Sequence, residues 1–528
     1  MLRRDFLRNS AVALAGLHAT PLVKGLDLSS FAEQDGVRYA EGYVFHDRGG
    51  VAVRRAGDPG VAGVAVSNGR DVVLTDRSGK YRIPVTEDCV LFSIKPRGWQ
   101  FPLDHHRKPQ SYYVHKPSGS PDFKYPGVRP TGSLPTSVDF ALRPQSEPDK
   151  FRMIMFGDPQ PRNQTEIDYI AHDVVEQCAR DAAEMDCRFG ISLGDIMFDD
   201  LSLFESLNSV VASVDRPWYT VVGNHDLNFD SPNTYRSTET WHRVYGPTHY
   251  AFNYGPVHFL VLNNILWRGG ENRGYHGEIT AEQLEFVKND LAHVPKDRLL
   301  VVCMHIPIVN VENREALYRL IEDRPHTVSF SAHTHVAAHH FLGEEQGWKG
   351  STPHHHVNHA TVCGSWWQGA TDERGIPHAT MSDGGPNGYS IVEFDKHRYK
   401  IMFRPASRPA SEQMAIWLAD EVASGETAAV IVNVFAGSER SVTEMRVGAG
   451  EWVKMEQFAG QCPFFVRLKE METSPTPPNG MKLPNPSTTR HLWRANLPGL
   501  RRGTHRVEVR TTDMFGQTFT DFRVVRVV

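Results

Sequence analysis

The chain has 528 residues, 40% of them hydrophobic, so it exceeds what one core usually supports and can bury an enzyme-sized interior. Its 57 basic and 62 acidic residues are mixed along the sequence and give a formal net charge of −5. This composition gives no indication of nucleic-acid binding. The six cysteines lie far apart and form no CxxC pair, so the sequence predicts neither a zinc ribbon nor a dense disulfide framework. Their spacing is compatible with a single disulfide bridge. The 26 histidines favour metal chemistry.

Residues 1–25 are predicted to be an export signal. Arg3 and Arg4 precede a short apolar run at 11–17, and this pattern resembles a twin-arginine signal. The alternative is a basic cytosolic N-terminus that contains paired arginines. The run is shorter than the roughly 20 residues that span a bilayer, so we expect no membrane span in the mature protein. The signal predicts the twin-arginine export machinery as a partner and a periplasmic or secreted location.

A β-sandwich is predicted for residues 36–145. Apolar runs at 64–67 and 72–75 flank Asn68-Gly69, a strong hairpin signal because both residues tolerate positive φ. The pattern over about 50 residues here resembles carboxypeptidase-regulatory-type sandwiches. A Pro/Gly/Ser-rich stretch at 116–135 is expected to be a surface loop.

Residues 150–404 alternate apolar runs with helical segments, as a layered α/β domain requires. The helical segments are expected at 164–185, 200–214 and 280–292. This domain is predicted to be catalytic.

Residues 405–528 return to short β-runs, for example at 428–432 and 505–509, around a proline-rich loop at 474–486. A second β-sandwich is predicted there.

Five short polar clusters in the middle domain each follow an apolar run. They begin at Gly157, Gly194, Gly223, His305 and Ala332. If each run is a strand, every cluster lies at a strand's carboxyl end, where open α/β sheets bind ligands. Their carboxylates, carboxamides and imidazoles suit two divalent cations bridged by one aspartate. The surplus positive charge of the two cations would bind a hydroxide and a phosphate.

At these clusters the sequence resembles the calcineurin-like metallophosphoesterase superfamily, whose ordered pattern is D-x-H, G-D-x-x-D/H, G-N-H-D/E, H and G-H-x-H. The resemblance implies a four-layer α/β/β/α core flanked by two all-β sandwich domains. The metal ligands that it implies are Asp158, Gln160 and His335 for one ion, Asn224, His305 and His333 for the other, and Asp195 as the bridge. By the same resemblance, His225 is catalytic and faces the substrate, with Asp226 orienting its ring.

Two positions depart from the family pattern. Gln160 stands where histidine is usual, and its harder oxygen donor favours manganese, iron or magnesium at that site, although zinc is possible. Ala332 replaces a glycine, which is tolerable unless the backbone there needs positive φ.

Other histidines and aromatics leave alternatives open. His354-His355-His356 with His359 is either a further metal site or, by default, a solvated rim loop. His339-His340 is a weaker candidate for metal binding.

Trp366-Trp367 is either a substrate platform or buried packing. Arg162 is expected to be solvated, with phosphate contact as the alternative, and Cys303 to be a buried thiol.

The predicted function is an exported dinuclear-metal phosphomonoesterase or phosphodiesterase, with a metal-bridging hydroxide as nucleophile and His225 as general acid. Its substrate is expected to be a small-molecule or lipid-derived phosphoester, and nucleic acid is not expected. The alternative is a catalytically idle surface protein that binds carbohydrate or protein and keeps a structural metal site. A nuclease of the same superfamily would prefer a basic groove, which the mixed charge does not support.

Overall fold

The structure is a computed structural model that describes residues 37–269, 274–472 and 483–528. The predicted export signal at 1–25 and positions 474–482 of the proline-rich loop lie outside the described residues. From Tyr39 to Val528 the chain forms one unit by its internal contacts.

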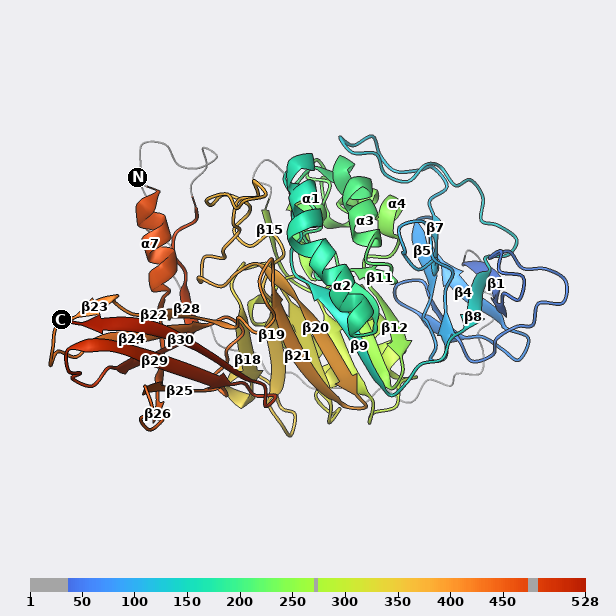
Figure 1. The fold of residues 1–528 in the computed structure, drawn as a ribbon. Coiled ribbons are helices and arrows are strands. Elements are labelled where there is room, and N and C mark those ends of the chain that lie inside the picture. The colour runs from blue at the N-terminus through green and yellow to red at the C-terminus, as the bar shows by residue number, and fades with distance from the viewer. Residues whose placement is uncertain (1–36, 270–273, 473–482) are drawn as a thin grey trace, which may run out of the picture. The chain divides into compact units, whose positions relative to one another are not determined.

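The first sheet of the middle domain has five strands in the order β11-β10-β9-β20-β21, and Figure 1 labels all of them except β10. Their bounds are β9 (Lys150–Phe156), β10 (Cys187–Ser192), β11 (Trp218–Thr220), β20 (Gly388–Asp395) and β21 (Arg398–Pro405). Strand β10 runs parallel to β9 and β11, whereas β20 is antiparallel to β9. The carboxyl ends of β9, β10 and β11 therefore meet at one edge of the sheet.

The second sheet has six strands in the order β12-β13-β16-β17-β19-β18. Their bounds are β12 (Tyr250–Tyr254), β13 (Val257–Val261), β16 (Leu299–Cys303), β17 (Thr327–Ser331), β18 (Ala338–Leu342) and β19 (His354–Asn358). Strands β13, β16, β17 and β19 are parallel, and the two edge strands are antiparallel to their neighbours. A hairpin of β14 (Ile265–Gly269) and β15 (Gly274–Gly277) lies outside this sheet.

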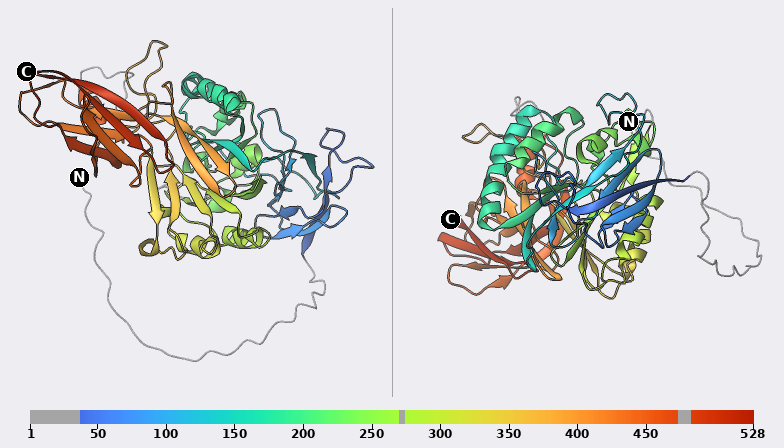
Figure 2. Two further views of the ribbon diagram at one scale, coloured as in Figure 1. Left: turned by 60° about the horizontal axis from the view of Figure 1, so that its bottom comes forward. Right: turned by 90° about the vertical axis from the view of Figure 1, so that its right-hand side faces the viewer.

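The two sheets pack face to face. Along each strand, successive side chains point in turn to the core between the sheets and to the core beneath the helices on that sheet's outer face. Met153 and Met155 of β9 face the second sheet, where they join Phe259 and Val301, whereas Ile154 contributes to the core beneath the helices. Each such fully buried apolar side chain contributes roughly 1.5–3 kcal/mol. Figure 2 gives two further views of these layers.

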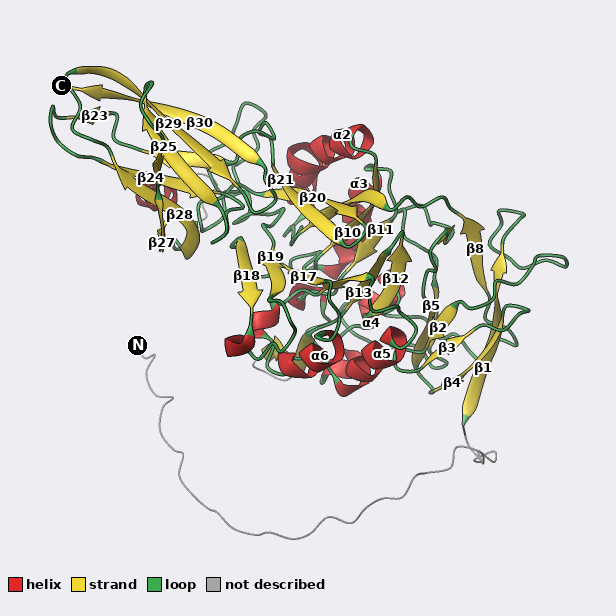
Figure 3. Ribbon diagram, turned by 90° about the horizontal axis from the view of Figure 1, so that it is seen from below, coloured by secondary structure: helices red, strands yellow, loops and turns green. Residues whose placement is uncertain are grey.

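Helices cover the outer face of each sheet, which confirms the four-layer α/β/β/α core. On the five-stranded sheet lie α1 (Gln164–Ile170), α2 (Glu176–Glu184), α3 (Phe204–Ala212) and α4 (Glu239–Tyr245). On the six-stranded sheet lie α5 (Ala281–Leu291) and α6 (Arg314–Ile321), which Figure 3 shows from below. The predicted helix at 164–185 is interrupted by a π-helical turn, Ala171–Val175. Asn163 caps the start of α1, where its side chain accepts a 3.1 Å hydrogen bond from the Glu166 backbone N–H.

The N-terminal region forms two four-stranded sheets around one apolar core. Their strands are β1 (Arg38–His46), β4 (Lys80–Val85), β6 (Trp99–Gln100) and β8 (Phe140–Pro144), then β2 (Ala65–Ser67), β3 (Val72–Leu74), β5 (Cys89–Ser93) and β7 (Tyr112–His115). The predicted hairpin is confirmed, because β2 and β3 pair antiparallel with Ser67 opposite Val72.

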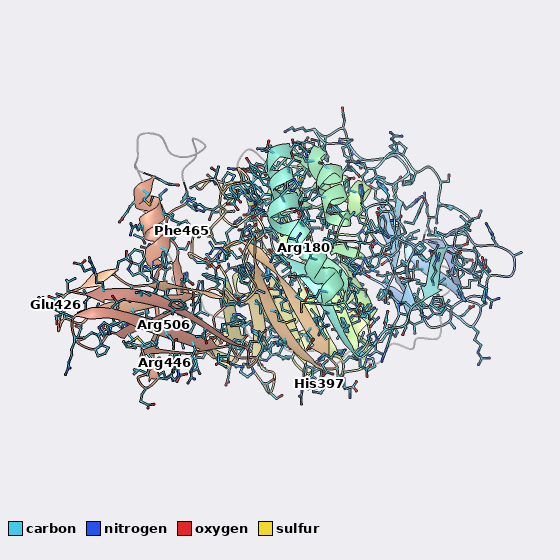
Figure 4. All side chains as sticks on the ribbon, in the orientation of Figure 1. Arg180, His397, Glu426, Arg446, Phe465 and Arg506 are labelled. Carbon is cyan, nitrogen blue, oxygen red and sulfur yellow. The ribbon has the colours of Figure 1, made fainter. Side chains whose placement is uncertain are left out.

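The C-terminal region also forms two sheets, with the orders β22-β24-β28-β27 and β23-β30-β29-β25-β26. Their strands are β22 (Met414–Trp417), β23 (Glu421–Val422), β24 (Ala429–Val434), β25 (Val442–Val447), β26 (Val453–Lys454), β27 (Glu456–Gln461), β28 (Thr488–Asn496), β29 (Gly503–Thr512) and β30 (Thr518–Val527). Helix α7 (Pro463–Met471) packs on them through Phe465, which Figure 4 labels.

All six cysteines lie in described segments, and each is a free thiol. Cys303 is buried on β16, as predicted. In the described part of the chain, no helix is long and apolar enough to cross a membrane.

Candidate metal centre

The five polar clusters lie at the carboxyl ends of β9, β10, β11, β16 and β17, as the sequence predicts. The clusters of the two sheets contact each other. His305, which follows β16 of the six-stranded sheet, donates a 2.8 Å hydrogen bond from Nδ1 to the carbonyl of Leu193, which follows β10 of the five-stranded sheet. Gly194 is required at this meeting point. Its φ is +94°, and a Cβ there would lie 2.4 Å from His305 Nδ1.

The backbone is strained where the predicted ligands lie. The φ angles are 28° at Asp158, 39° at Gln160, 46° at Asp195, 74° at His333 and 54° at His335. Non-glycine residues at positive φ cost roughly 1–3 kcal/mol and cluster at functional sites. Ala332 is not among the residues with positive φ, so its replacement of glycine introduces no such strain.

Asp195, Asn224, His305 and His333 come together in one cluster. His305 Nε2 lies 3.2 Å from Asp195 Oδ2, 3.1 Å from Asn224 Oδ1 and 3.2 Å from His333 Nδ1. Nδ1 of His305 donates to the Leu193 carbonyl, so Nε2 is the nitrogen that faces these atoms and would bind an ion. Four electron-pair donors that converge in this way fit a cation.

Asp158 and His335 form the neighbouring part of the site. His335 Nε2 lies 3.3 Å from Asp158 Oδ2, and its Nδ1 donates to the Gly364 carbonyl at 2.5 Å. Gln160 joins this part to Asp195, because its Nε2 donates to Asp195 Oδ2 at 3.0 Å. The oxygen of Gln160 faces Cys363 Sγ at 3.7 Å, so the ligand role of Gln160 stays a prediction.

The electrostatics of the cluster favour positive charge. Burial lowers the pKa of His305, but Asp195 and Asp158 raise it more, so that it reaches about 9. Both carboxylates are almost completely buried. Buried carboxylates are costly unless they are paired or coordinate metals, and this donor set therefore fits two divalent ions.

His225 lies beside the cluster, on the 3-10 turn Asn224–Asp226. Its backbone N–H donates to Asp195 Oδ1 at 2.9 Å, and its ring stacks on Phe198 with centroids 4.7 Å apart. Burial lowers the pKa of His225, but Asp195 and then the hydrogen bond with Asp199 raise it above its ordinary value.

The predicted role of Asp226 is wrong. Its carboxylate accepts hydrogen bonds from the backbone N–H groups of Ile196, Met197 and Gly223, at 2.8–3.1 Å. The carboxylate that contacts the imidazole of His225 is Asp199, with Oδ1 2.5 Å from Nδ1. Asp226 thus holds the loop after β10, and Asp199, four residues after Asp195, orients the ring.

The two tryptophans have different environments. Trp366 is half-buried beside the site, 4.9 Å from the His335 ring and 5.5 Å from the Phe198 ring. Trp367 is buried and donates to Asp173 Oδ2 at 3.2 Å. Packing is therefore confirmed for Trp367, whereas a platform role of Trp366 stays a prediction. Sequence reasoning missed Phe198, which carries no motif signal.

Arg162 is not a solvated side chain. Its Nε donates to Glu166 Oε1 at 2.7 Å, and its guanidinium lies 5.7 Å from the Trp366 ring.

The histidine run at 354–356 does not form a solvated rim loop. It lies on β19 and is buried; hydroxyl groups of the adjacent strand β17 contact His354 and His356, and the Tyr399 hydroxyl contacts His355 Nδ1 at 2.6 Å. His354 Nε2 and His356 Nδ1 each lie 2.7 Å from Ser329 Oγ, and His356 Nε2 lies 3.0 Å from Ser331 Oγ. These histidines therefore stabilise the interior.

The fold and the site define a metal-dependent hydrolase. Family models match three consecutive parts of the chain: the N terminal of calcineurin-like phosphoesterase at 48–126, calcineurin-like phosphoesterase at 151–337, and the C terminal of calcineurin-like phosphoesterase at 356–519. Together they match most of the chain, which belongs to the calcineurin-like phosphoesterases and is a metal-dependent phosphoester hydrolase.

Similarity to individual proteins is low. A purple acid phosphatase from yellow lupin (Lupinus luteus) seeds is 13% identical, with 66% of this chain and 68% of that chain covered and a TM-score of 0.37. A conjugative transposon lipoprotein from Bacteroides eggerthii is 11% identical, with 21% and 93% covered and a TM-score of 0.12. No curated protein matches the chain.

Proposed function

We propose that this hydrolase uses two divalent ions to cleave phosphomonoesters or phosphodiesters of small-molecule or lipid-derived compounds. The position of Asp195 supports the proposal most directly. Its Oδ2 lies 3.0 Å from Gln160 Nε2 in one half of the site and 3.2 Å from His305 Nε2 in the other. An aspartate between two sets of donors is suited to bridging two ions.

The proposed ligands are those that the family pattern implies. Asp158, Gln160 and His335 would hold the first ion, Asn224, His305 and His333 the second, and Asp195 both. When bound, such an ion pair acidifies a water molecule and polarises the phosphoryl group. An amide oxygen at Gln160 would favour manganese, iron or magnesium in the first site.

His225 is proposed as the general acid. Asp199 would hold a proton on Nδ1 and leave Nε2 to donate to the departing oxygen. The half-buried rings of Phe198 and Trp366 would exclude water beside it. An idle metal site would need neither the His225–Asp199 pair nor these aromatics.

The test compares wild type with Asp195→Ala. The wild type is expected to bind about two ions per chain and to hydrolyse members of a panel of monoester, diester and pyrophosphate substrates. Asp195→Ala should lose most of both ions, because a bridging ligand serves both sites. A fully loaded Asp195→Ala protein, measured by elemental analysis, would contradict the assignment. The substrate panel separates the monoesterase from the diesterase activity.

Export by the twin-arginine machinery is part of the proposal. The paired arginines before an apolar run support it. Arg3-Arg4→Lys-Lys should block export, and normal periplasmic accumulation of that variant would contradict the signal.

A further inference from the structure

Three side chains hold the loop that carries His333 and His335. The carboxylate of Asp158 accepts the His333 backbone N–H at 3.1 Å. Asn358 Nδ2 donates to Thr334 Oγ1 at 2.5 Å and to the Val336 carbonyl. The end of the loop is held by Asp383, whose Oδ2 accepts the Ala337 backbone N–H at 2.8 Å. Both histidines have positive φ, and a strained loop keeps such angles only where its surroundings fix them.

Asp383 is a fully buried carboxylate on the segment between β19 and β20. Its Oδ1 accepts the Gly385 backbone N–H at 2.8 Å, and its Oδ2 lies 3.1 Å from His491 Nε2. A buried carboxylate needs hydrogen-bond donors. Within this set of contacts, His491 is the side chain that supplies one.

His491 lies on β28 of the C-terminal sandwich and is also buried. Its Nδ1 is 2.7 Å from Asn433 Oδ1 on β24. The amide orientation of Asn433 is set by a 2.9 Å hydrogen bond from Nδ2 to the Asp383 carbonyl. Both ring nitrogens of His491 therefore face oxygen atoms, and Nε2 is the one that faces the carboxylate of Asp383.

We propose that His491 and Asn433 are positioning residues for the metal centre. They hold Asp383, and Asp383 holds the Ala337 end of the loop, two residues from His335. The inference rests on the proposed ligand role of His335. The C-terminal sandwich thereby contributes to metal affinity without contacting substrate. The family model at 356–519 spans all of these residues except the loop itself.

The effect should be stronger for one ion than for the other. His333 is held directly by Asp158, whereas the far side of the loop is held by Asn358 and Asp383. His335 also donates to Gly364, which lies on the same segment as Asp383. Loss of the His491 imidazole would leave the buried carboxylate of Asp383 without its side-chain hydrogen-bond donor and would displace this side. The first ion, at Asp158, Gln160 and His335, should weaken more than the second.

The test is a manganese titration of metal-free protein, followed by binding isotherms for both sites. His491→Phe keeps the bulk of the ring but removes both ring nitrogens, and it should weaken the binding of one of the two ions about 10- to 100-fold. His491→Gln can still donate to Asp383 and should stay much closer to wild type. Asp383→Ala should resemble His491→Phe.

The matched control is Thr443→Val in the same sandwich. It removes a buried 3.1 Å hydrogen bond between Thr443 Oγ1 and Thr511 Oγ1 that lies apart from the metal loop. It should lower thermal stability and leave both manganese affinities unchanged. Equal weakening by Thr443→Val and His491→Phe, or equal loss of both ions in His491→Phe, would overturn the positioning role.

His335→Ala separates this inference from the proposed function. If His335→Ala loses an ion but His491→Phe binds both as wild type does, the positioning role is wrong and the ligand assignment stands. If His335→Ala itself binds both ions normally, the ligand assignment fails, and the inference fails with it.

Discussion

His225 Nδ1 lies 2.5 Å from Asp199 Oδ1. The side chain of His225 is 25% exposed. A carboxylate at Nδ1 fixes the imidazole and keeps a proton there, so Nε2 is the nitrogen free to exchange a proton with substrate. The pair therefore has the arrangement expected of a general acid and its orienting group.

His225→Asn should keep its metal ions and lose about 10²- to 10⁴-fold in rate on alkyl phosphoesters. An alkoxide leaves poorly without a proton, whereas nitrophenolate leaves readily, so the loss on a nitrophenyl ester should be much smaller. Asp199→Asn should show a milder version of the same pattern. The measurement is kcat on both esters, together with metal content.

Asp200→Asn is the matched control, because its carboxylate contacts Ser202 and not His225. It should leave both rates near wild type. Equal losses on the two esters in His225→Asn, with metal content intact, would mean that His225 binds phosphate and does not protonate the leaving group.

Gln160→His should shift the first site toward zinc, because an imidazole nitrogen replaces a harder oxygen donor. Hydrolysis should persist. The measurement is competition between zinc and manganese for the metal-free protein. Gln164→His, on the exposed face of α1, should leave the preference unchanged. A Gln160→His protein that binds no metal would contradict a ligand role at this position.

Gly194→Ala should destabilise the protein and weaken metal binding, because a Cβ at φ +94° would lie 2.4 Å from His305 Nδ1. Gly516→Ala is matched in backbone strain, with φ +78° and nothing within 4 Å of the added Cβ. It should cost about 1–3 kcal/mol from strain alone and leave metal affinity unchanged. Urea unfolding and metal titration measure both effects. Equal outcomes for the two variants would contradict the steric role of Gly194.

The unfolding free energy should fall in acid because buried histidines must remain neutral. Burial lowers the pKa of His354 to about 3 from its ordinary value of 6.5. Between these values the unfolded chain binds more protons than the folded one. Stability is therefore present above pH about 6.5 and falls by up to ~1.4 kcal/mol per pH unit below it for this histidine.

His354→Gln should flatten this dependence, measured as urea unfolding between pH 7 and pH 4.5. His172→Gln changes a largely exposed histidine on the π-helical turn and should leave the slope unchanged. A slope that His354→Gln does not alter would show that the folded protein can protonate His354 without cost.

Local patterns predicted most of the fold and the composition of the site. Apolar runs of strand length, each followed by a polar cluster, are local features, and parallel strands bring their carboxyl ends to one edge. For this reason Asp158, Asp195 and His305 could be placed together without coordinates. The Asn68-Gly69 hairpin was predictable for the same reason, since turn chemistry depends on adjacent residues.

Contacts between distant segments could not be predicted in the same way. Asp226 follows His225 in sequence, but the 3-10 turn directs its carboxylate to the N–H groups of Ile196 and Met197, which leaves Asp199 to meet the ring. The histidine run at 354–356 is polar in composition, yet it forms a buried strand in which hydroxyl groups of β17 contact His354 and His356.

The sequence by itself determined the family and the layered fold, and it predicted the donor residues of the metal centre, because motif and periodicity are local features of neighbouring residues. Tertiary structure alone decided which carboxylate orients His225, which tryptophan borders the site, and that His491 of the C-terminal sandwich contacts Asp383. These are choices among partners far apart in the chain, and side-chain packing and the satisfaction of buried polar groups settle them.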